Sequence, residues 1–112
     1  MIVNINEKTL IDFIEKLRPP VEIRSQLDYA YSMHNNTILL FELRPNWMSP
    51  ENDEMQQLPF AKIRYYKSQA VWKLYWMRAN GNWELYKPFP IETSLDKLLN
   101  EVKEDKHACF FG

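Results

Sequence analysis

Two runs in which apolar and polar residues alternate, 71–79 and 82–86, flank the dipeptide Asn80-Gly81. Asn and Gly tolerate the positive φ angles of a two-residue type I′ turn, so the pattern predicts a tight β-hairpin. A two-residue loop puts Trp76 opposite Leu85 and Tyr75 opposite Tyr86, and facing residues share one side of a sheet. We therefore expect a core side and an outer side. The core side holds Trp72, Leu74, Trp76, Trp83 and Leu85, with Arg78 at its rim, and the outer side holds Val71, Lys73, Tyr75, Met77, Glu84 and Tyr86.

A second hairpin is predicted by an alternating run at 27–33 and a denser apolar run at 37–44, separated by Asn35-Asn36. A two-residue loop there places Met33 opposite Ile38. The apolar run is ambiguous, because both its odd and its even positions are hydrophobic. We expect the odd set, Leu39, Phe41 and Leu43, to face the core, since that leaves Glu42 and Arg44 outside.

A further strand is predicted over residues 60–66 and joins the first hairpin through the four-residue turn 67–70. Pairing Tyr66 with Val71 sets Arg64 beside Lys73 and Lys62 beside Tyr75. Residues 46–59 show no periodicity and include Glu51, Asp53 and Glu54, so we interpret them as a loop of about fourteen residues. Loops of this length are often functional or mobile.

Apolar residues at helical spacing predict one helix at each end of the chain. The first covers residues 7–17, capped by Asn6 and ended by Arg18-Pro19-Pro20, and the second begins at a Thr93–Asp96 capping box and ends near Asp105. The apolar segment 108–112 is expected to pack on the sheet. The predicted fold class is α+β: an N-terminal helix, an antiparallel meander sheet of about five strands and a C-terminal helix, with both helices on one sheet face.

Length and composition indicate one folded domain, residues 1–112. A hydrophobic share of 46% and only two glycines are typical of a globular chain. The net charge of −1 gives no general attraction to nucleic acid or membranes, and no apolar run reaches the ~18 residues of a membrane span. Because the single cysteine, Cys109, fits a reducing compartment, we expect a cytoplasmic protein.

The principal candidate site is cationic. Residues 60–87 hold six lysines and arginines against one carboxylate, Glu84. On the predicted outer side, Lys62, Arg64 and Lys73 stand among aromatic rings, a combination that single-stranded nucleic acid binders use. The same composition is also typical of a solvated outer face, or of an interface with another protein or a second copy. The candidate ligand-binding residues are Lys62, Arg64, Lys73, Tyr66, Tyr75 and Tyr86.

Arginines and tryptophans together suggest a secondary pocket for a carboxylate or phosphate, because an arginine lying over an indole presents its fork outward. The alternative is that Glu42 only forms a structural ion pair. Arg18 and Arg24 could join this pocket, and its candidate residues are Glu42, Arg44, Trp47, Arg78 and Trp83.

Catalytic chemistry has little support in the sequence. His107 and Cys109 lack an orienting third group and an oxyanion hole. A zinc site from His34, Asp105, His107 and Cys109 lacks the usual close spacing of ligands. With glycines only at positions 81 and 112, a phosphate-cradling P-loop is excluded. We expect no catalytic residue, no metal and no cofactor.

Several motifs together resemble a bacterial family designated domain of unknown function 3024, over nearly the whole chain. They are Arg18-Pro19-Pro20, the segment 42–47, Pro59 with Ala61-Lys62, the run 72–76 with Trp83 and Tyr86, and Phe110-Phe111-Gly112. The resemblance implies a small cytosolic bacterial protein with no assigned activity, cofactor or catalytic residue. It also implies a possible accessory role, as in proteins carried by integron cassettes.

Three functional hypotheses follow from these features. The first is a non-enzymatic module that binds an anionic ligand or single-stranded nucleic acid through the basic and aromatic sheet face. The second is a self-associating or protein-binding accessory protein that uses the same face. An enzyme built on Glu42 and Arg44 ranks third, and no membrane partner is expected.

Overall fold

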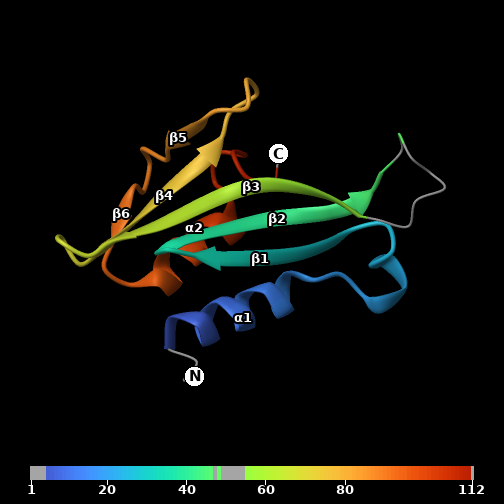
Figure 1. The fold of residues 1–112 in the computed structure, drawn as a ribbon, viewed down its shortest axis with the longest axis horizontal. Coiled ribbons are helices and arrows are strands. Elements are labelled where there is room, and N and C mark those ends of the chain that lie inside the picture. Colours follow the sequence, from blue (N-terminus) through green and yellow to red (C-terminus); the bar gives the residue numbers. More distant parts are fainter. Residues whose placement is uncertain (1–4, 47, 49–54, 112) are drawn as a thin grey trace.

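The computed structural model describes residues 5–46, 48 and 55–111, and it confirms the predicted α+β fold (Figure 1). Its elements, in chain order, are α1 (Ile5–Leu17), the 3₁₀ helix η1 (Val21–Ile23), β1 (Asp28–His34), β2 (Thr37–Pro45), β3 (Met55–Tyr66), β4 (Val71–Met77), β5 (Trp83–Leu85), β6 (Ile91–Glu92) and α2 (Leu95–Glu104). Among the described residues no helix has the length and apolar character needed to cross a membrane.

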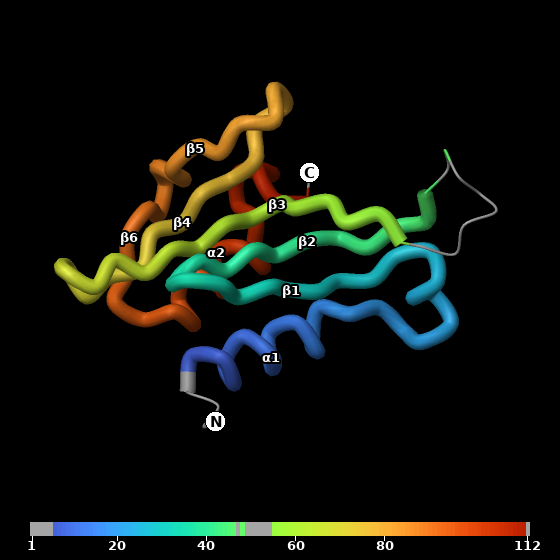
Figure 2. The backbone as a smooth tube through the Cα atoms, viewed as in Figure 1, coloured from blue at the N-terminus to red at the C-terminus, as the bar shows by residue number. Residues whose placement is uncertain are grey.

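The sheet is an antiparallel meander in the order β1-β2-β3-β4-β5, with the short β6 also paired to β4 (Figure 2). β5 and β6 together complete the edge beyond β4. At the point where they meet, the Tyr86 N–H donates to the Leu74 carbonyl at 2.8 Å and the Leu74 N–H donates to the Pro90 carbonyl at 3.0 Å. Both backbone groups of Leu74 are therefore satisfied although no single strand spans the edge.

Both helices lie on one side of the sheet, which we call the helix face. α2 passes behind the strands in the view of Figure 1, and α1 runs along β1. The opposite side, the open face, is covered by no helix among the described elements. The buried core lies on the helix face, and its fully or nearly fully buried members are Leu10, Ile14, Ile38, Leu40, Phe60, Ala61, Ile63, Trp72, Leu74, Tyr86, Leu95, Leu98, Leu99, Val102 and Phe110.

The hairpin of β1 and β2 has the predicted register, with Met33 opposite Ile38 and a two-residue turn. Asn35 and Asn36 both adopt positive φ, +46° and +64°, as a type I′ turn requires. The expected core side of β2 was wrong, although Phe41 of the expected set is buried on the open face, at 8% exposed. Ile38 and Leu40 are 0% exposed, because they lie opposite Ile63 and Ala61 of β3 and so share the helix face with them.

β3 begins at Met55, so the loop predicted over 46–59 was wrong for residues 55–59, which pair with β2. The prediction for residues 47 and 49–54 lies outside the described residues. Leu40 pairs with Ala61 but Phe41 pairs with Pro59, so β3 has a β-bulge at Phe60. Because the bulge breaks the alternation, Phe60 enters the core, whereas unbroken alternation along β3 would place it on the same side as Lys62.

The hairpin between β4 and β5 differs from the prediction by one residue. Met77 pairs with Trp83, Trp76 with Glu84 and Tyr75 with Leu85. The Gly81 N–H donates to the Arg78 carbonyl at 2.9 Å, and Gly81 has φ +85°. These features define a three-residue loop, Ala79-Asn80-Gly81, in which only the glycine needs positive φ. A slip of one residue moves every side chain of β5 to the other face.

The helices agree with the prediction apart from their caps, and so do Phe110 and Phe111, which pack on the sheet, while residue 112 lies outside the described residues. α1 starts earlier than predicted, so Asn6 lies inside it, and Ser94 rather than Thr93 precedes α2. Asp105 ends α2 with φ +46°, and its carboxylate accepts the backbone N–H groups of Phe110 and Phe111. This holds Phe110 against Tyr86, with ring centroids 4.9 Å apart.

The two sides of β2 predict different costs of truncation. Leu40→Ala removes a fully buried side chain and should lower the free energy of unfolding by about 2–5 kcal/mol. Leu39→Ala, the matched control on the open face, should cost less than about half as much, because Leu39 is only half-buried. Urea unfolding measures both. A larger cost at Leu39 would mean that the faces of β2 are reversed.

Candidate functional site

Five of the six principal candidate residues gather on the open face, as the register of β3 and β4 predicts. Lys62 pairs with Tyr75, Arg64 pairs with Lys73, and Tyr66 pairs with Val71. Trp83 joins them, because it pairs with Met77 on the same side of β4. We call Lys62, Arg64, Tyr66, Lys73, Tyr75 and Trp83 the basic–aromatic face.

The cations of this face lie over its rings. Lys62 Nζ is 4.9 Å from the centroid of Tyr75 and 5.8 Å from that of Trp83. The guanidinium carbon of Arg64 and Nζ of Lys73 lie 5.4 Å and 4.6 Å from the Tyr66 centroid. Such contacts are worth about 0.5–1 kcal/mol each at exposed sites. They hold flexible cations in defined positions without neutralising their charge.

The two tyrosines are joined through their hydroxyl groups, whose oxygens are 2.5 Å apart. Burial, together with this hydrogen bond, raises the pKa of Tyr75 to about 12. Tyr75 is therefore neutral at physiological pH. It adds hydrogen-bonding capacity to the cationic face and no negative charge.

Tyr86, the sixth candidate, does not belong to this face. It is 0% exposed in the core against Phe110, and its hydroxyl has no hydrogen-bond partner among the described atoms. The one-residue slip between β4 and β5 turns it inward. The same slip turns Trp83, which we expected in the core, outward, so the open face exchanges one aromatic residue for another.

The secondary pocket is not assembled. Arg44 Nε donates to Glu42 at 2.7 Å on β2, whereas Arg78 pairs with Glu84 at 3.6 Å on the β4–β5 hairpin. β3 separates the two pairs. Glu42 shares the helix face with its partner Tyr29, while Trp83 lies on the open face. The prediction for Trp47 lies outside the described residues.

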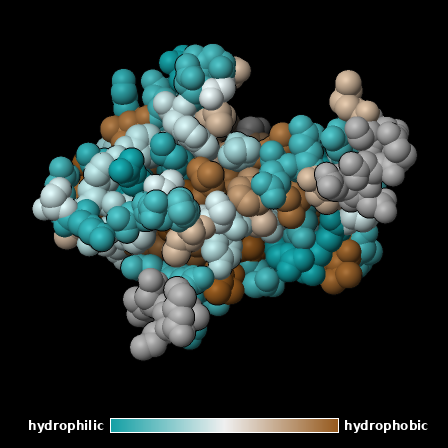
Figure 3. All heavy atoms as spheres, in the orientation of Figure 1, coloured by the Kyte–Doolittle hydropathy of each residue, from teal (hydrophilic) through white to brown (hydrophobic). Residues whose placement is uncertain are grey.

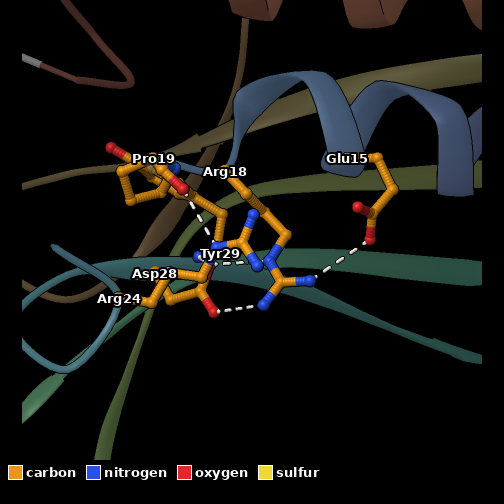
Figure 4. Close-up of polar contacts among 6 residues, drawn as sticks. All are labelled: Glu15, Arg18, Pro19, Arg24, Asp28 and Tyr29. Atoms are coloured by element: carbon orange, nitrogen blue, oxygen red, sulfur yellow. Dashed lines mark hydrogen bonds and ion pairs between the residues drawn. The ribbon is translucent and has the colours of Figure 1, made fainter. Parts of the chain in front are cut away.

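Arg18 and Arg24 have structural roles where α1 ends (Figure 4). Arg18 Nε and Nη2 donate to the two carboxylate oxygens of Asp28, both at 2.9 Å, and Figure 4 shows the two side chains facing each other. Arg24 donates to the Pro19 carbonyl at 2.9 Å. The hydrogen bonds from Arg18 lower the pKa of Asp28. This bidentate pair ties the helix exit to the start of β1.

His107 and Cys109 do not form a nucleophilic pair. The Cys109 thiol donates to the His107 carbonyl at 3.7 Å, and burial raises its pKa, with Asp105 and Glu84 adding to the rise. A raised pKa keeps the thiol protonated and weakly nucleophilic. In the described part of the chain, no three His, Cys, Asp or Glu side chains are grouped to hold a metal ion.

An apolar strip that we did not predict for this side also lies on the open face. Leu39 pairs with Lys62, and alternation along β2 places Leu39, Phe41 and Leu43 on the same side. Figure 3 shows apolar atoms gathered near the middle of this face, with hydrophilic atoms to the left, where β3 turns into β4. The register of β2 against β3 was the signal that could have located the strip.

Residues 2–112 match a family model described as Domain of unknown function (DUF3024). The chain belongs to this family. No curated protein and no solved structure matches it. The DUF3024 description assigns no activity, so a function for this DUF3024 protein must follow from its own side chains.

The raised pKa of Tyr75 predicts a change in stability with pH. Its folded-state pKa of about 12 exceeds the ~10 of an unfolded tyrosine. Tyr75 therefore contributes fully to the free energy of unfolding below pH ~10, and this contribution is lost as the pH rises toward 12. In Tyr75→Phe, the free energy of unfolding, measured with urea, should decrease less steeply over this pH interval than in the parent protein. Tyr66→Phe should lower the Tyr75 pKa only in part, since burial remains. An equally steep fall in Tyr75→Phe would contradict the assignment.

The facing cations Arg64 and Lys73 predict an unusual effect of charge reversal. Like charges directly opposite each other destabilise a sheet, and opposite charges stabilise it by about 0.2–1 kcal/mol. Lys73→Glu also loses the contact with Tyr66, worth about 0.5–1 kcal/mol. At low salt, the free energy of unfolding of the variant, measured with urea, should therefore equal that of the parent or exceed it by up to about 1 kcal/mol. A loss above ~1 kcal/mol would show that Lys73 is needed for the fold.

Proposed function

We propose that this protein is a non-enzymatic binding module whose basic–aromatic face receives an anionic partner. One arrangement carries the proposal. Among the described residues, Lys62, Arg64 and Lys73 form no ion pair, unlike Arg18, Arg44, Arg78 and Lys106. Other lysines, such as Lys8 on α1, form none either, so the feature that matters is that these three cations are gathered together. The three unpaired cations share one sheet face and are held over rings.

Local charge supports this proposal better than net charge does. The whole chain carries −1, so a polyanion gains nothing from long-range attraction to the molecule as a whole. Attraction must come from the cluster on β3 and β4, within about a Debye length. Such a module would take one orientation on its partner, with the helix face turned away. A cytoplasmic location, which suits the single free cysteine, is part of the proposal.

Self-association is the second candidate, and the apolar strip on β2 favours it. On the open face, the partly exposed Leu39 and Leu43 flank Phe41, which is only 8% exposed, and apolar residues rimmed by polar ones are typical of protein interfaces. An enzyme remains third, because Glu42 and Arg44, on which that hypothesis depends, pair with each other.

Salt dependence separates the first two candidates. Binding of fluorescent poly-L-glutamate or a labelled oligonucleotide, followed by anisotropy, should weaken by about tenfold or more between 50 and 200 mM NaCl, because ion contacts are screened. Lys62→Ala should weaken it further at low salt. Lys8→Ala, on the exposed side of α1, is the matched control and should leave binding unchanged.

Light scattering on the same samples tests whether the protein self-associates instead. If the open face binds anions, it must be free in solution. Light scattering should then give the mass of one chain at every salt concentration. A salt-insensitive dimer in which Tyr75 and Trp83 are buried, together with no binding of either polyanion, would reject the first candidate in favour of self-association.

A further inference from the structure

Arg64 and Lys73 occupy directly facing positions of β3 and β4. Facing like charges are unfavourable, and sheets normally avoid them or neutralise them with a neighbouring carboxylate. The described neighbours of the pair on this face are Lys62, Tyr66, Val71 and Tyr75 on β3 and β4, Thr37 opposite Arg64 on β2, and Ile91 opposite Lys73 on β6. None of them is acidic. The pair therefore lacks a counter-charge from its surroundings, and an external anion would supply one.

The two tyrosines add a hydrogen-bond donor at the same place. Tyr66 and Tyr75 lie diagonally on either side of the Arg64–Lys73 pair, and their hydroxyls are hydrogen-bonded to each other. In such a pair one hydroxyl donates and the other accepts, so one hydroxyl proton remains for a ligand. Both cations lie over the ring of Tyr66. A guanidinium, an ammonium and a hydroxyl thus come from two adjacent strands.

This donor set fits a phosphate better than a carboxylate. A carboxylate presents two oxygens in one plane and is satisfied by a single arginine fork, as Asp28 is by Arg18 in this protein. A phosphate presents more oxygens in a tetrahedral arrangement and accepts from several directions. Donors of three kinds on two strands match that arrangement.

The residues around the Arg64–Lys73 pair favour a nucleic acid strand over a single phosphate ion. Lys62 is two residues from Arg64 on the same strand face, about 6–7 Å along β3, and offers a second cation. Its Nζ is shared between the rings of Tyr75 and half-buried Trp83. Alternating cations and rings on an open sheet are the pattern with which proteins bind unpaired bases and the backbone that joins them.

We propose that the basic–aromatic face binds single-stranded nucleic acid, with one backbone phosphate held between Arg64 and Lys73 and the next part of the strand lying over Lys62 and Trp83. This inference rests on the proposed function and narrows it to one class of anion. A duplex would expose its phosphates but not its base faces, so the protein should prefer single strands.

The experiment uses the full chain with three labelled probes: oligothymidylate, a duplex of the same length, and poly-L-glutamate. Oligothymidylate should bind about tenfold or more tightly than either of the others. Its affinity should fall with salt with a logarithmic slope of about −1.4, as expected when two phosphates of a single strand are neutralised. Binding should also change the tryptophan fluorescence, and this change should shrink in Trp83→Leu.

Lys73→Glu separates binding from folding. It should weaken oligothymidylate binding about tenfold or more while its urea unfolding shows a folded protein at least as stable as the parent. Lys8→Glu makes the same charge change on exposed α1 and should leave the affinity within about twofold.

The outcomes distinguish the two proposals. If poly-L-glutamate binds as tightly as oligothymidylate and both depend on Lys62, the proposed function stands and the nucleic acid inference fails. If oligothymidylate binds but Lys73→Glu has no effect, the phosphate position is wrong and the inference fails. If none of the three probes binds, both proposals are overturned.

Discussion

The three-residue turn Ala79-Asn80-Gly81 determines which side chains β5 presents on each side of the sheet. Side chains alternate with a period of two, so the length of this turn decides which residues of β5 meet the helices and which lie with β3 and β4 on the open face. With three residues, Trp83 reaches Lys62 and the chain continues with Tyr86 inside the core. The turn at Gly81 therefore decides that Trp83, and not Tyr86, joins Tyr66 and Tyr75 in the candidate site.

Much of the fold could be predicted from the sequence because turn chemistry and alternation agree. Asn35-Asn36 favours a tight two-residue loop between the alternating run 27–33 and the apolar run 37–44, and the register of β1 with β2 follows from it. Asn80-Gly81 carries a degenerate signal, since the same dipeptide fits a type I′ turn or a three-residue loop with glycine last. The bulge at Phe60 left no mark in the local pattern, because an aromatic residue suits either side of a strand.

The candidate site was predictable as far as the turn 67–70 fixes the pairing of β3 and β4. That pairing brings Lys62, Arg64 and Lys73 together and needs no knowledge of the rest of the chain. The contacts that restrain the cations, and the hydroxyl pair of Tyr66 and Tyr75, depend on side-chain rotamers, which strand periodicity does not specify. Three of the arginines proposed for the secondary pocket each have a nearby carboxylate. They form local ion pairs with these carboxylates and do not come together in one pocket.

The register of β5 against β4 is the central claim, and nuclear Overhauser effects from the Trp83 indole in solution test it most directly. The structure predicts contacts from the indole to the side chains of Lys62 and Met77, and contacts from the Tyr86 ring to Phe110. Contacts from the Trp83 indole to Phe110 or to α2, with the Tyr86 ring near Lys62, would contradict it.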